Sequence, residues 1–262
     1  MSGKLPQSVK TLSVLHRSFP KGFDLLQQRI CSLRPFLDEA LLKKSTHFLN
    51  NELEAQNLDF RPKLYFGDEW FSPEGMNAIA IPFYLGHPLL ESLEKAQMSS
   101  IEGADCQSFM RLLRHEAGHC FDHCYQFSKR RKWKLIFGSP RIPYRPDHYK
   151  PDLTSRNHVI NLEYGYAQAH PDEDFAETFA VWLDPTRNWR KEYRQWPVAL
   201  KKLNYVEELA LESKELENLS EKGRLPYSAS QLKATLQNFY RKRKRNLTET
   251  IPNQRGNKRG KR

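Results

Sequence analysis

The chain has 262 residues, of which 39% are hydrophobic and 28% are charged, and this length and composition suffice for one substantial hydrophobic core. No stretch approaches the roughly 18 apolar residues of a membrane-spanning helix, and the N-terminal lead-in (residues 1–22) has no sustained apolar core. A cytoplasmic protein without a signal peptide is therefore expected, and four cysteines without a dense framework fit a reducing compartment.

The formal net charge of +11 is concentrated at the C-terminus. Residues 241–262 contain ten Lys or Arg and a single Glu, a net +9, so the other 240 residues carry only +2. A basic segment of this kind is typical of a solvated, disordered tail, with contact to nucleic acid or an acidic surface as the alternative role. The sequence thus predicts one folded domain, residues 23–240, between the lead-in 1–22 and the basic tail.

A helical region and two short strands are predicted first along the chain. Residues 23–58 show helical spacing of apolar residues, interrupted at Pro35. Residues 61–71 and 77–85 are short aromatic and β-branched stretches typical of strands. Because Pro82 cannot donate a ladder hydrogen bond, the second strand is expected at the edge of its sheet.

The later elements are predicted to be mainly helical. Apolar residues recur at three- and four-residue steps through 105–127, which predicts a helix with Asp105 as its N-cap. Four prolines in residues 138–152 predict a long loop of the kind that forms lids or binding sites. Helices are predicted for residues 171–183 and for most of 186–240, so the expected fold class is α+β, with a small mixed sheet and a predominantly helical C-terminal part.

The segment "HEAGH", residues 115–119, contains the candidate catalytic groups. Positions i and i+4 lie one turn apart on one helix face, so His115 and His119 can bind one zinc ion about 2.0–2.1 Å from each ring nitrogen. Glu116 is rotated by about 100° from His115; it misses the metal but can take a proton from a metal-bound water. The pattern is short, and a pair of surface histidines is the alternative.

A catalytic zinc ion needs a third protein ligand and an open fourth position. In the predicted helix 171–183, Glu177 stands between two phenylalanines, where solvation of a carboxylate is unfavourable. Small residues beside it, together with Gly118, would allow the two helices to cross closely. Glu177 is therefore predicted to be the third ligand, with Glu173 or Asp174 supporting the histidines through hydrogen bonds; a solvated surface charge is the alternative.

A hydrogen-bond donor opposite the base is also expected, because charge develops on the substrate carbonyl in the transition state. The first choice is Tyr166 and the second is His170, both just upstream of Glu177. Packing in the core is the alternative role for Tyr166, and an N-cap is the alternative for His170. The predicted edge strand 77–85 would suit an extended peptide that adds itself through main-chain hydrogen bonds.

The segments "RHEAGHCFDH" and "YAQAHPDEDFAETFAVWL" resemble a family of bacterial zinc-binding metallopeptidases on the gluzincin side of the zincin fold. The similarity covers roughly residues 60–210. It implies a zincin-like fold with one zinc ion per chain, His115, His119 and Glu177 as ligands, and Glu116 as base. Many members carry an N-terminal cysteine-rich zinc ribbon, whereas this chain has no Cys-x-x-Cys.

These observations together predict a zinc-dependent peptidase that hydrolyses peptide bonds in peptide or protein substrates. Glu116 activates the metal-bound water, and Tyr166 or His170 stabilises the oxyanion. A zinc hydrolase acting on another amide is one alternative. A non-catalytic zinc-containing protein that binds nucleic acid through the tail 241–262 is another.

Overall fold

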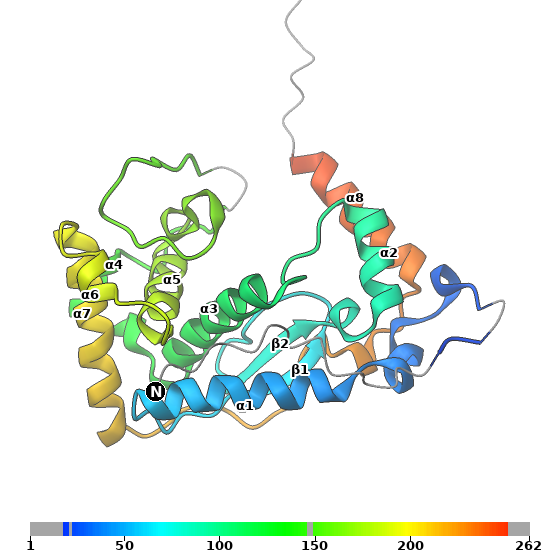
Figure 1. Ribbon diagram of the computed structural model, residues 1–262, viewed down its shortest axis with the longest axis horizontal. Helices are drawn as coiled ribbons and strands as arrows, with labels where there is room; N and C mark the ends of the chain where they lie inside the picture. Colours follow the sequence, from blue (N-terminus) through cyan, green and yellow to red (C-terminus); the bar gives the residue numbers. More distant parts are fainter. Residues whose placement is uncertain (1–17, 21–22, 146–148, 251–262) are drawn as a thin grey trace, which may run out of the picture.

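Eight α-helices and one pair of strands form the regular structure of the residues that the computed structural model describes, which are 18–20, 23–145 and 149–250 (Figure 1). The helices are α1 (Glu39–Ala55), α2 (Pro88–Met98), α3 (Cys106–Tyr125), α4 (Arg131–Phe137), α5 (Pro171–Leu183), α6 (Trp189–Glu192), α7 (Pro197–Glu212) and α8 (Leu236–Thr250). The strands are β1 (Lys63–Gly67) and β2 (Ala78–Pro82), and short 3-10 helices occupy Leu25–Gln27, Ile30–Phe36, Phe83–Gly86, Phe127–Lys129, Glu163–Gln168, Ser213–Glu215 and Ala229–Gln231. A helix-rich chain with a small sheet is compatible with the predicted α+β class.

The helix α3, which contains "HEAGH", lies at the centre of the molecule (Figure 1). It begins where the sequence predicted, because the Asp105 carboxylate accepts a hydrogen bond from the backbone N–H of Ser108 at 2.9 Å and so caps the helix. It ends at Tyr125, and the capping residue Gln126 adopts a left-handed conformation with φ of 56°. Leu113 and Phe121 of its apolar stripe are inaccessible to solvent. The helix that carries the histidines is therefore fixed along its whole length by the core.

The helix α5 crosses α3 at short distance because small residues meet there, as their positions in the sequence suggested. A Cβ atom on Gly118 of α3 would lie 2.8 Å from the Cα atom and 3.0 Å from the carbonyl oxygen of Ala176 of α5. All residues of α5 except Asp172 are buried. The acidic side chains of this helix must therefore find partners inside the protein, since an unpaired buried carboxylate is costly.

The small sheet is parallel rather than mixed in the part of the chain described here. Strands β1 and β2 pair from Lys63 opposite Ala78 to Gly67 opposite Pro82. The antiparallel component is a single bridge, in which the Ala80 backbone N–H donates to the Phe71 carbonyl at 2.8 Å. Pro82 stands at the end of β2, where its missing N–H has least effect on the ladder. All five residues of β2 are buried, so this strand is less open to a peptide than the sequence suggested.

Helices also dominate the C-terminal part, although residues 216–228 form irregular structure where helix was expected. The helix α7 packs against α5, and the Lys202 ammonium donates to the Asp174 carboxylate at 2.6 Å in a buried ion pair. Burial raises the pKa of Asp174 to about 7, and Lys202 opposes this shift. Asp174 thus faces α7 and does not support the histidines.

None of the helices described combines the length and apolar character that crossing a bilayer requires.

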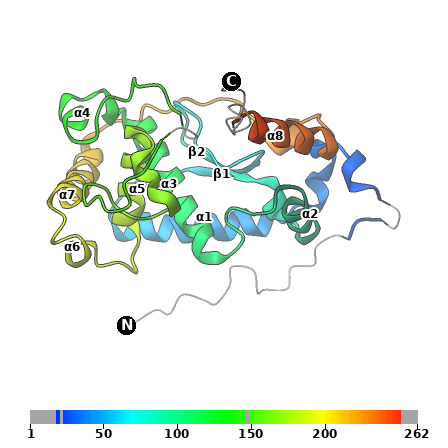
Figure 2. The ribbon, with the colours of Figure 1, turned by 90° about the horizontal axis from the view of Figure 1, so that it is seen from above.

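The helix α8 extends through residues 241–250, the first part of the segment for which a solvated tail was predicted. It lies beside α2 (Figure 2), where the Arg243 guanidinium donates to the nearly inaccessible Glu94 carboxylate at 2.7 Å and stacks over the Phe239 ring. The partner for this basic residue comes from far away in the sequence, which a charge count cannot reveal. Residues 251–262, like most of the lead-in 1–22, lie outside the described part of the chain.

We expect Gly118→Ala to destabilise the protein by about 1–3 kcal/mol, because the added methyl group would overlap the Ala176 backbone and force α3 and α5 apart. Urea unfolding would measure this change. Gly223→Ala is the matched control, since its Cβ atom would meet only the flexible end of Met76. Alanine is the better helix former by about 1 kcal/mol, so a stabilised Gly118→Ala variant would show that the crossing is not tight.

Candidate metal centre

Three side chains of α3 and α5 direct one ligand atom each at a common point. The two Nε2 atoms of His115 and His119 are 3.1 Å apart, and the Glu173 Oε2 atom lies 3.1 Å from the first and 3.2 Å from the second. This is the group of three potential metal-binding side chains found among the described residues. Two lone-pair-bearing nitrogens and a carboxylate at such distances require a cation between them, either a proton or a metal ion.

The spacing of these atoms fits a zinc ion. Ligand atoms about 2.0–2.1 Å from a tetrahedral zinc ion are roughly 3.3 Å apart, close to the 3.1–3.2 Å that separates the atoms of His115, His119 and Glu173. Two imidazoles and one carboxylate form a donor set used by catalytic zinc sites, which leave the fourth position open. The arrangement can therefore hold a zinc ion without rearrangement of the helices.

Glu177 lies behind His115 rather than beside the ligand atoms. Its Oε1 atom accepts hydrogen bonds from His115 Nδ1–H at 2.9 Å and from Asn161 Nδ2–H at 2.8 Å, and its Oε2 atom accepts from the Leu162 backbone N–H at 2.8 Å. The prediction that Glu177 is the third ligand does not fit this geometry, because Nδ1 and Nε2 point to opposite sides of the ring. Glu173, expected to support the histidines, occupies the ligand position instead.

The hydrogen bond from His115 to Glu177 fixes the form of the imidazole. A proton held on Nδ1 leaves the lone pair of Nε2 for the metal. Burial disfavours the charged imidazolium, but the hydrogen bonds with Glu173 and Glu177 outweigh it and raise the pKa of His115 to about 10. The carboxylate of Glu173 is affected in the opposite sense: burial would raise its pKa, yet the two histidines lower it well below the usual range.

Glu116 is buried beside the two histidines and has an unused acceptor. Its Oε2 atom is inaccessible and has no hydrogen-bond partner within the described residues. Burial raises the pKa of Glu116, while the nearby His115 and His119 oppose the shift. A carboxylate with a raised pKa and a free acceptor suits proton transfer near neutral pH, and the structure therefore places Glu116 where the sequence predicted a base.

The two predicted oxyanion donors differ in their surroundings. The Tyr166 ring lies 5.7 Å from the His115 ring, and its hydroxyl is 2.6 Å from the hydroxyl of Tyr144. His170 caps α5: its Nδ1 atom accepts from the Asp172 backbone N–H at 3.2 Å, and its Nε2–H donates to the Ile142 carbonyl at 2.9 Å. Both nitrogens of His170 are thus occupied, so the N-cap alternative describes it and its proposed catalytic role does not fit.

Tyr144, Asn161 and Leu162 were not foreseen as parts of the site. Tyr144 comes from the proline-rich loop, and burial together with the Glu173 carboxylate raises the pKa of this tyrosine to about 12. Asn161 and Leu162 both donate hydrogen bonds to Glu177, and Asn161 also donates to the Arg111 carbonyl at 3.5 Å. No spacing rule connects them to the histidines, and only the proline content of residues 138–152 indicated that this loop could reach a binding site.

The backbone before Tyr166 is held in an uncommon conformation. Tyr164 and Gly165 both have positive φ, 58° and 63°, inside the 3-10 helix Glu163–Gln168. A left-handed tyrosine costs about 1 kcal/mol or more, and Tyr149 donates a hydrogen bond to its carbonyl at 3.2 Å. This turn positions Tyr166 beside His115.

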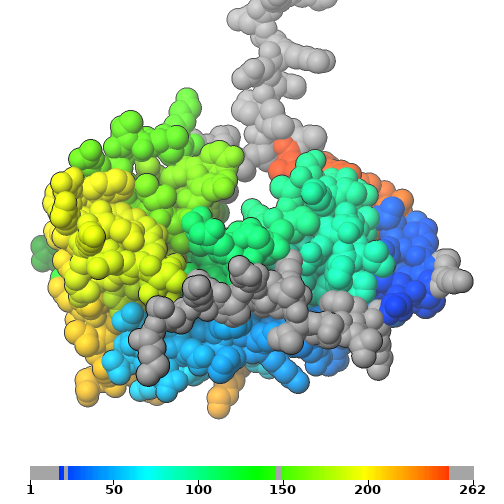
Figure 3. All heavy atoms as spheres, viewed as in Figure 1, coloured from blue at the N-terminus to red at the C-terminus, as the bar shows by residue number. Residues whose placement is uncertain are grey.

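The surface above α3 is hollowed (Figure 3). The hollow lies between α2 on one side and α5 and the loop before it on the other side, which leaves space for a ligand.

Taken together, a His, His and Glu cluster with a buried unpaired glutamate is the kind of site that zinc-binding hydrolases use. Residues 95–223 match the model of the family described as "Putative zinc-binding metallo-peptidase". This match contains both α3 and α5, and it confirms the resemblance seen in the sequence. No curated protein and no solved structure matches the chain significantly. Nothing in these comparisons supports a nucleic-acid-binding protein.

The metal content of two variants would identify the third ligand. We expect Glu173→Ala to lose zinc, because one of three ligand atoms disappears, whereas Glu177→Gln should retain it with about 10- to 100-fold weaker affinity, since only the support of His115 is altered. Elemental analysis of the purified variants, followed by chelator competition, measures both effects. Full zinc content in Glu173→Ala combined with its loss in Glu177→Gln would reverse the assignment.

Zinc affinity should rise with pH. The pKa of His115 in the metal-free protein is about 10, so below that pH zinc must displace a proton, and affinity should increase about tenfold per pH unit for each proton released. Competition with a chromophoric chelator at pH 6, 7 and 8 measures this slope. His47→Gln, which changes an exposed histidine on α1, should leave the slope intact. A pH-independent affinity would argue against bound protons at the site.

Proposed function

We propose that this protein is a zinc-dependent peptidase with a zincin-like fold, in which His115, His119 and Glu173 hold one zinc ion. The observation that carries the proposal is the convergence of their three ligand atoms beside the unpaired carboxylate of Glu116. The match of residues 95–223 to a zinc-binding metallopeptidase family supports it independently. Peptides or proteins are the substrates that such a family implies.

The chain's own residues have distinct roles in this proposal. When bound, zinc supplies a Lewis acid that acidifies water and polarises a carbonyl group. Glu116 accepts the proton from the attacking water at its free oxygen and then delivers it to the leaving amine, which its raised pKa favours. Glu177 holds His115 in the form that presents Nε2 to the ion.

Tyr166 is the proposed donor to the substrate carbonyl oxygen. Its hydroxyl lies 2.6 Å from that of Tyr144, so each can orient the other, and burial together with the Glu173 charge raises the pKa of Tyr166. A tyrosine with a raised pKa keeps its proton and remains a hydrogen-bond donor through the reaction.

All four cysteines are free thiols, which suits the reducing cytoplasm that we propose as the compartment of this protein.

We expect Glu116→Gln to retain one zinc ion per chain and to lower peptide hydrolysis by about 10²- to 10⁴-fold, because the amide cannot accept the proton. Glu217→Gln, at an exposed glutamate in the irregular segment after α7, is the matched control and should hydrolyse peptides at the parent rate. Cleavage of a peptide mixture followed by mass spectrometry, with zinc content measured on the same samples, tests the proposal. Parent-like cleavage by the zinc-loaded Glu116→Gln variant would refute the role of Glu116.

A further inference from the structure

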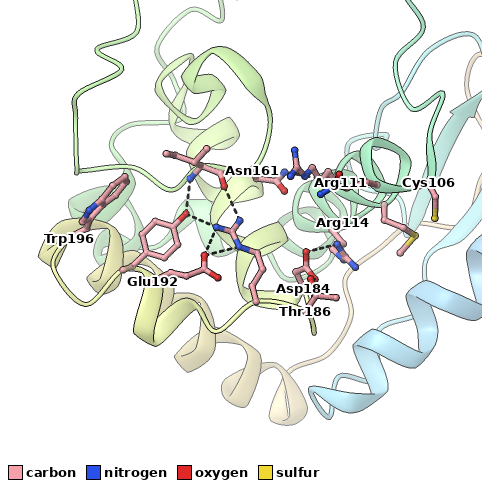
Figure 4. A pocket seen from close by; sticks show the side chains of 13 residues that line it. Cys106, Arg111, Arg114, Asn161, Asp184, Thr186, Glu192 and Trp196 are labelled. Carbon is pink, nitrogen blue, oxygen red and sulfur yellow. Dashed lines mark hydrogen bonds and ion pairs between the residues drawn. The ribbon is translucent and has the colours of Figure 1, made fainter. Parts of the chain in front are cut away.

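A cavity of about 740 Å³ lies along the N-terminal half of α3, next to the metal centre. Figure 4 shows it between α3, the segment around Asn161, and the region of Glu192 and Trp196. A volume of this size is in the range of small-molecule and side-chain binding pockets. Its walls are largely apolar, with a few convergent polar groups, which is typical of a site that selects one kind of side chain.

The cavity shares a wall with the metal centre. Asn161 lines the cavity, and its amide donates to Glu177, which in turn accepts from His115. Arg111, another lining residue, precedes His115 by four positions on α3, so the two side chains are neighbours on one helix face. Arg111 extends from α3 toward Asn161 (Figure 4). A ligand bound at Arg111 would therefore lie one helical turn from His115.

Three arginines line the cavity, and two of them are fully engaged. Arg114 donates to Glu52 at 2.6 and 2.7 Å and to Asp184 at 2.8 Å. Arg187 is engaged in the same way by a carboxylate, a backbone carbonyl and a tyrosine hydroxyl. Arg111 differs: its guanidinium forms no ion pair or hydrogen bond with any residue that the structure describes, and it is only half-buried. One cation of the wall is thus available to a ligand.

A second donor is available at the far side of the cavity. The Tyr193 hydroxyl oxygen accepts hydrogen bonds from the Ile160 backbone N–H at 2.9 Å and from Arg187 at 3.1 Å. Its own hydrogen is therefore free to be donated, because no acceptor among the described residues is bonded to it. Since Tyr193 also lines the cavity, a ligand with acceptor atoms can contact it as well as Arg111.

We propose that this cavity is a substrate subsite that binds a peptide carboxylate through Arg111. The inference rests on the proposed peptidase function and names the substrate class of that site. A planar carboxylate matches the single free guanidinium, because the other two arginines of the wall are already paired with carboxylates of the protein. The carboxylate can come from an Asp or Glu side chain next to the cleaved bond, or from the C-terminus of the substrate.

Matched peptides separate these two sources. One set carries Glu or Gln on either side of the scissile bond with an amidated C-terminus, and the other carries Gln throughout with a free or an amidated C-terminus. The zinc-loaded full chain should cleave the carboxylate-containing member of one set with a kcat/KM about 10- to 100-fold higher than its neutral partner. The set that shows this difference identifies the source, and equal kcat/KM values within both sets would overturn the inference.

The variant Arg111→Gln should remove this preference by raising KM for the carboxylate-containing peptide about 10- to 100-fold, while one zinc ion per chain is retained. Arg131→Gln at the exposed start of α4 is the matched control and should keep the preference. Charge reversal by Arg111→Glu should favour a Lys-containing peptide instead. If the Arg111→Gln variant still prefers the carboxylate-containing peptide, another residue binds the carboxylate.

Binding to the zinc-loaded Glu116→Gln protein distinguishes a failure of this inference from a failure of the proposed function. Fluorescence anisotropy of labelled Glu- and Gln-containing peptides measures affinity without hydrolysis. Tighter binding of the Glu peptide that is lost when Arg111→Gln is added supports the subsite, even if the parent protein cleaves no peptide and the peptidase proposal fails. Equal affinities of both peptides would reject the subsite, whether or not the parent protein cleaves them.

Discussion

The close crossing of α3 and α5 is the constraint on which the metal centre depends. Gly118 and Ala176 bring the two backbones into contact, and this contact sets both the separation of the helices and their offset along the axis. At that offset Glu173 meets the Nε2 atoms of the two histidines, and Glu177, one turn further along α5, accepts a hydrogen bond from Nδ1–H of His115. Larger side chains at the crossing would separate the imidazoles from the carboxylates by more than a coordination length. The contact that packs the two helices therefore also sets the geometry of the candidate metal site.

Burial of charged groups around this crossing explains why the site is so fully bonded. The helix α5 lies inside the protein, and each buried carboxylate there costs several kcal/mol unless it is paired. Asp174 finds Lys202, Glu177 accepts three hydrogen bonds, and Glu173 faces the two imidazoles. One oxygen of Glu116 and one of Asp174 lack a partner in the described part of the chain, but Glu116 lies beside His115 and His119. An unsatisfied buried acceptor next to the converging ligand atoms is suited to bind a reacting group.

Much of this site could be predicted from local sequence, and the part that could not depends on tertiary contacts. The three-residue pattern and the helical periodicity predicted a helix on which His115 and His119 converge beside Glu116, and α3 has this arrangement because it follows from the geometry of a single helix. The choice between Glu173 and Glu177 lay beyond such reasoning: both are on one face of α5, about 6 Å apart along its axis, and only the offset at Gly118 decides between them. The basic segment in α8 shows the same limit, because Arg243 is neutralised by Glu94, which is 149 positions away.

The proline-rich loop 138–152 and the start of α5 are held together by the hydrogen bonds of one residue, His170. His170 both caps α5 and donates to the carbonyl of Ile142, so the start of the helix and the proline-rich loop share an anchor. From that loop Tyr144 reaches the Tyr166 hydroxyl, close to Glu173. A shift of the loop would therefore alter the surroundings of the proposed metal ligand Glu173 and of the proposed oxyanion donor Tyr166 together. Because fixed donors lose less entropy when a substrate binds, anchoring the loop through the cap of the ligand helix favours a preorganised site.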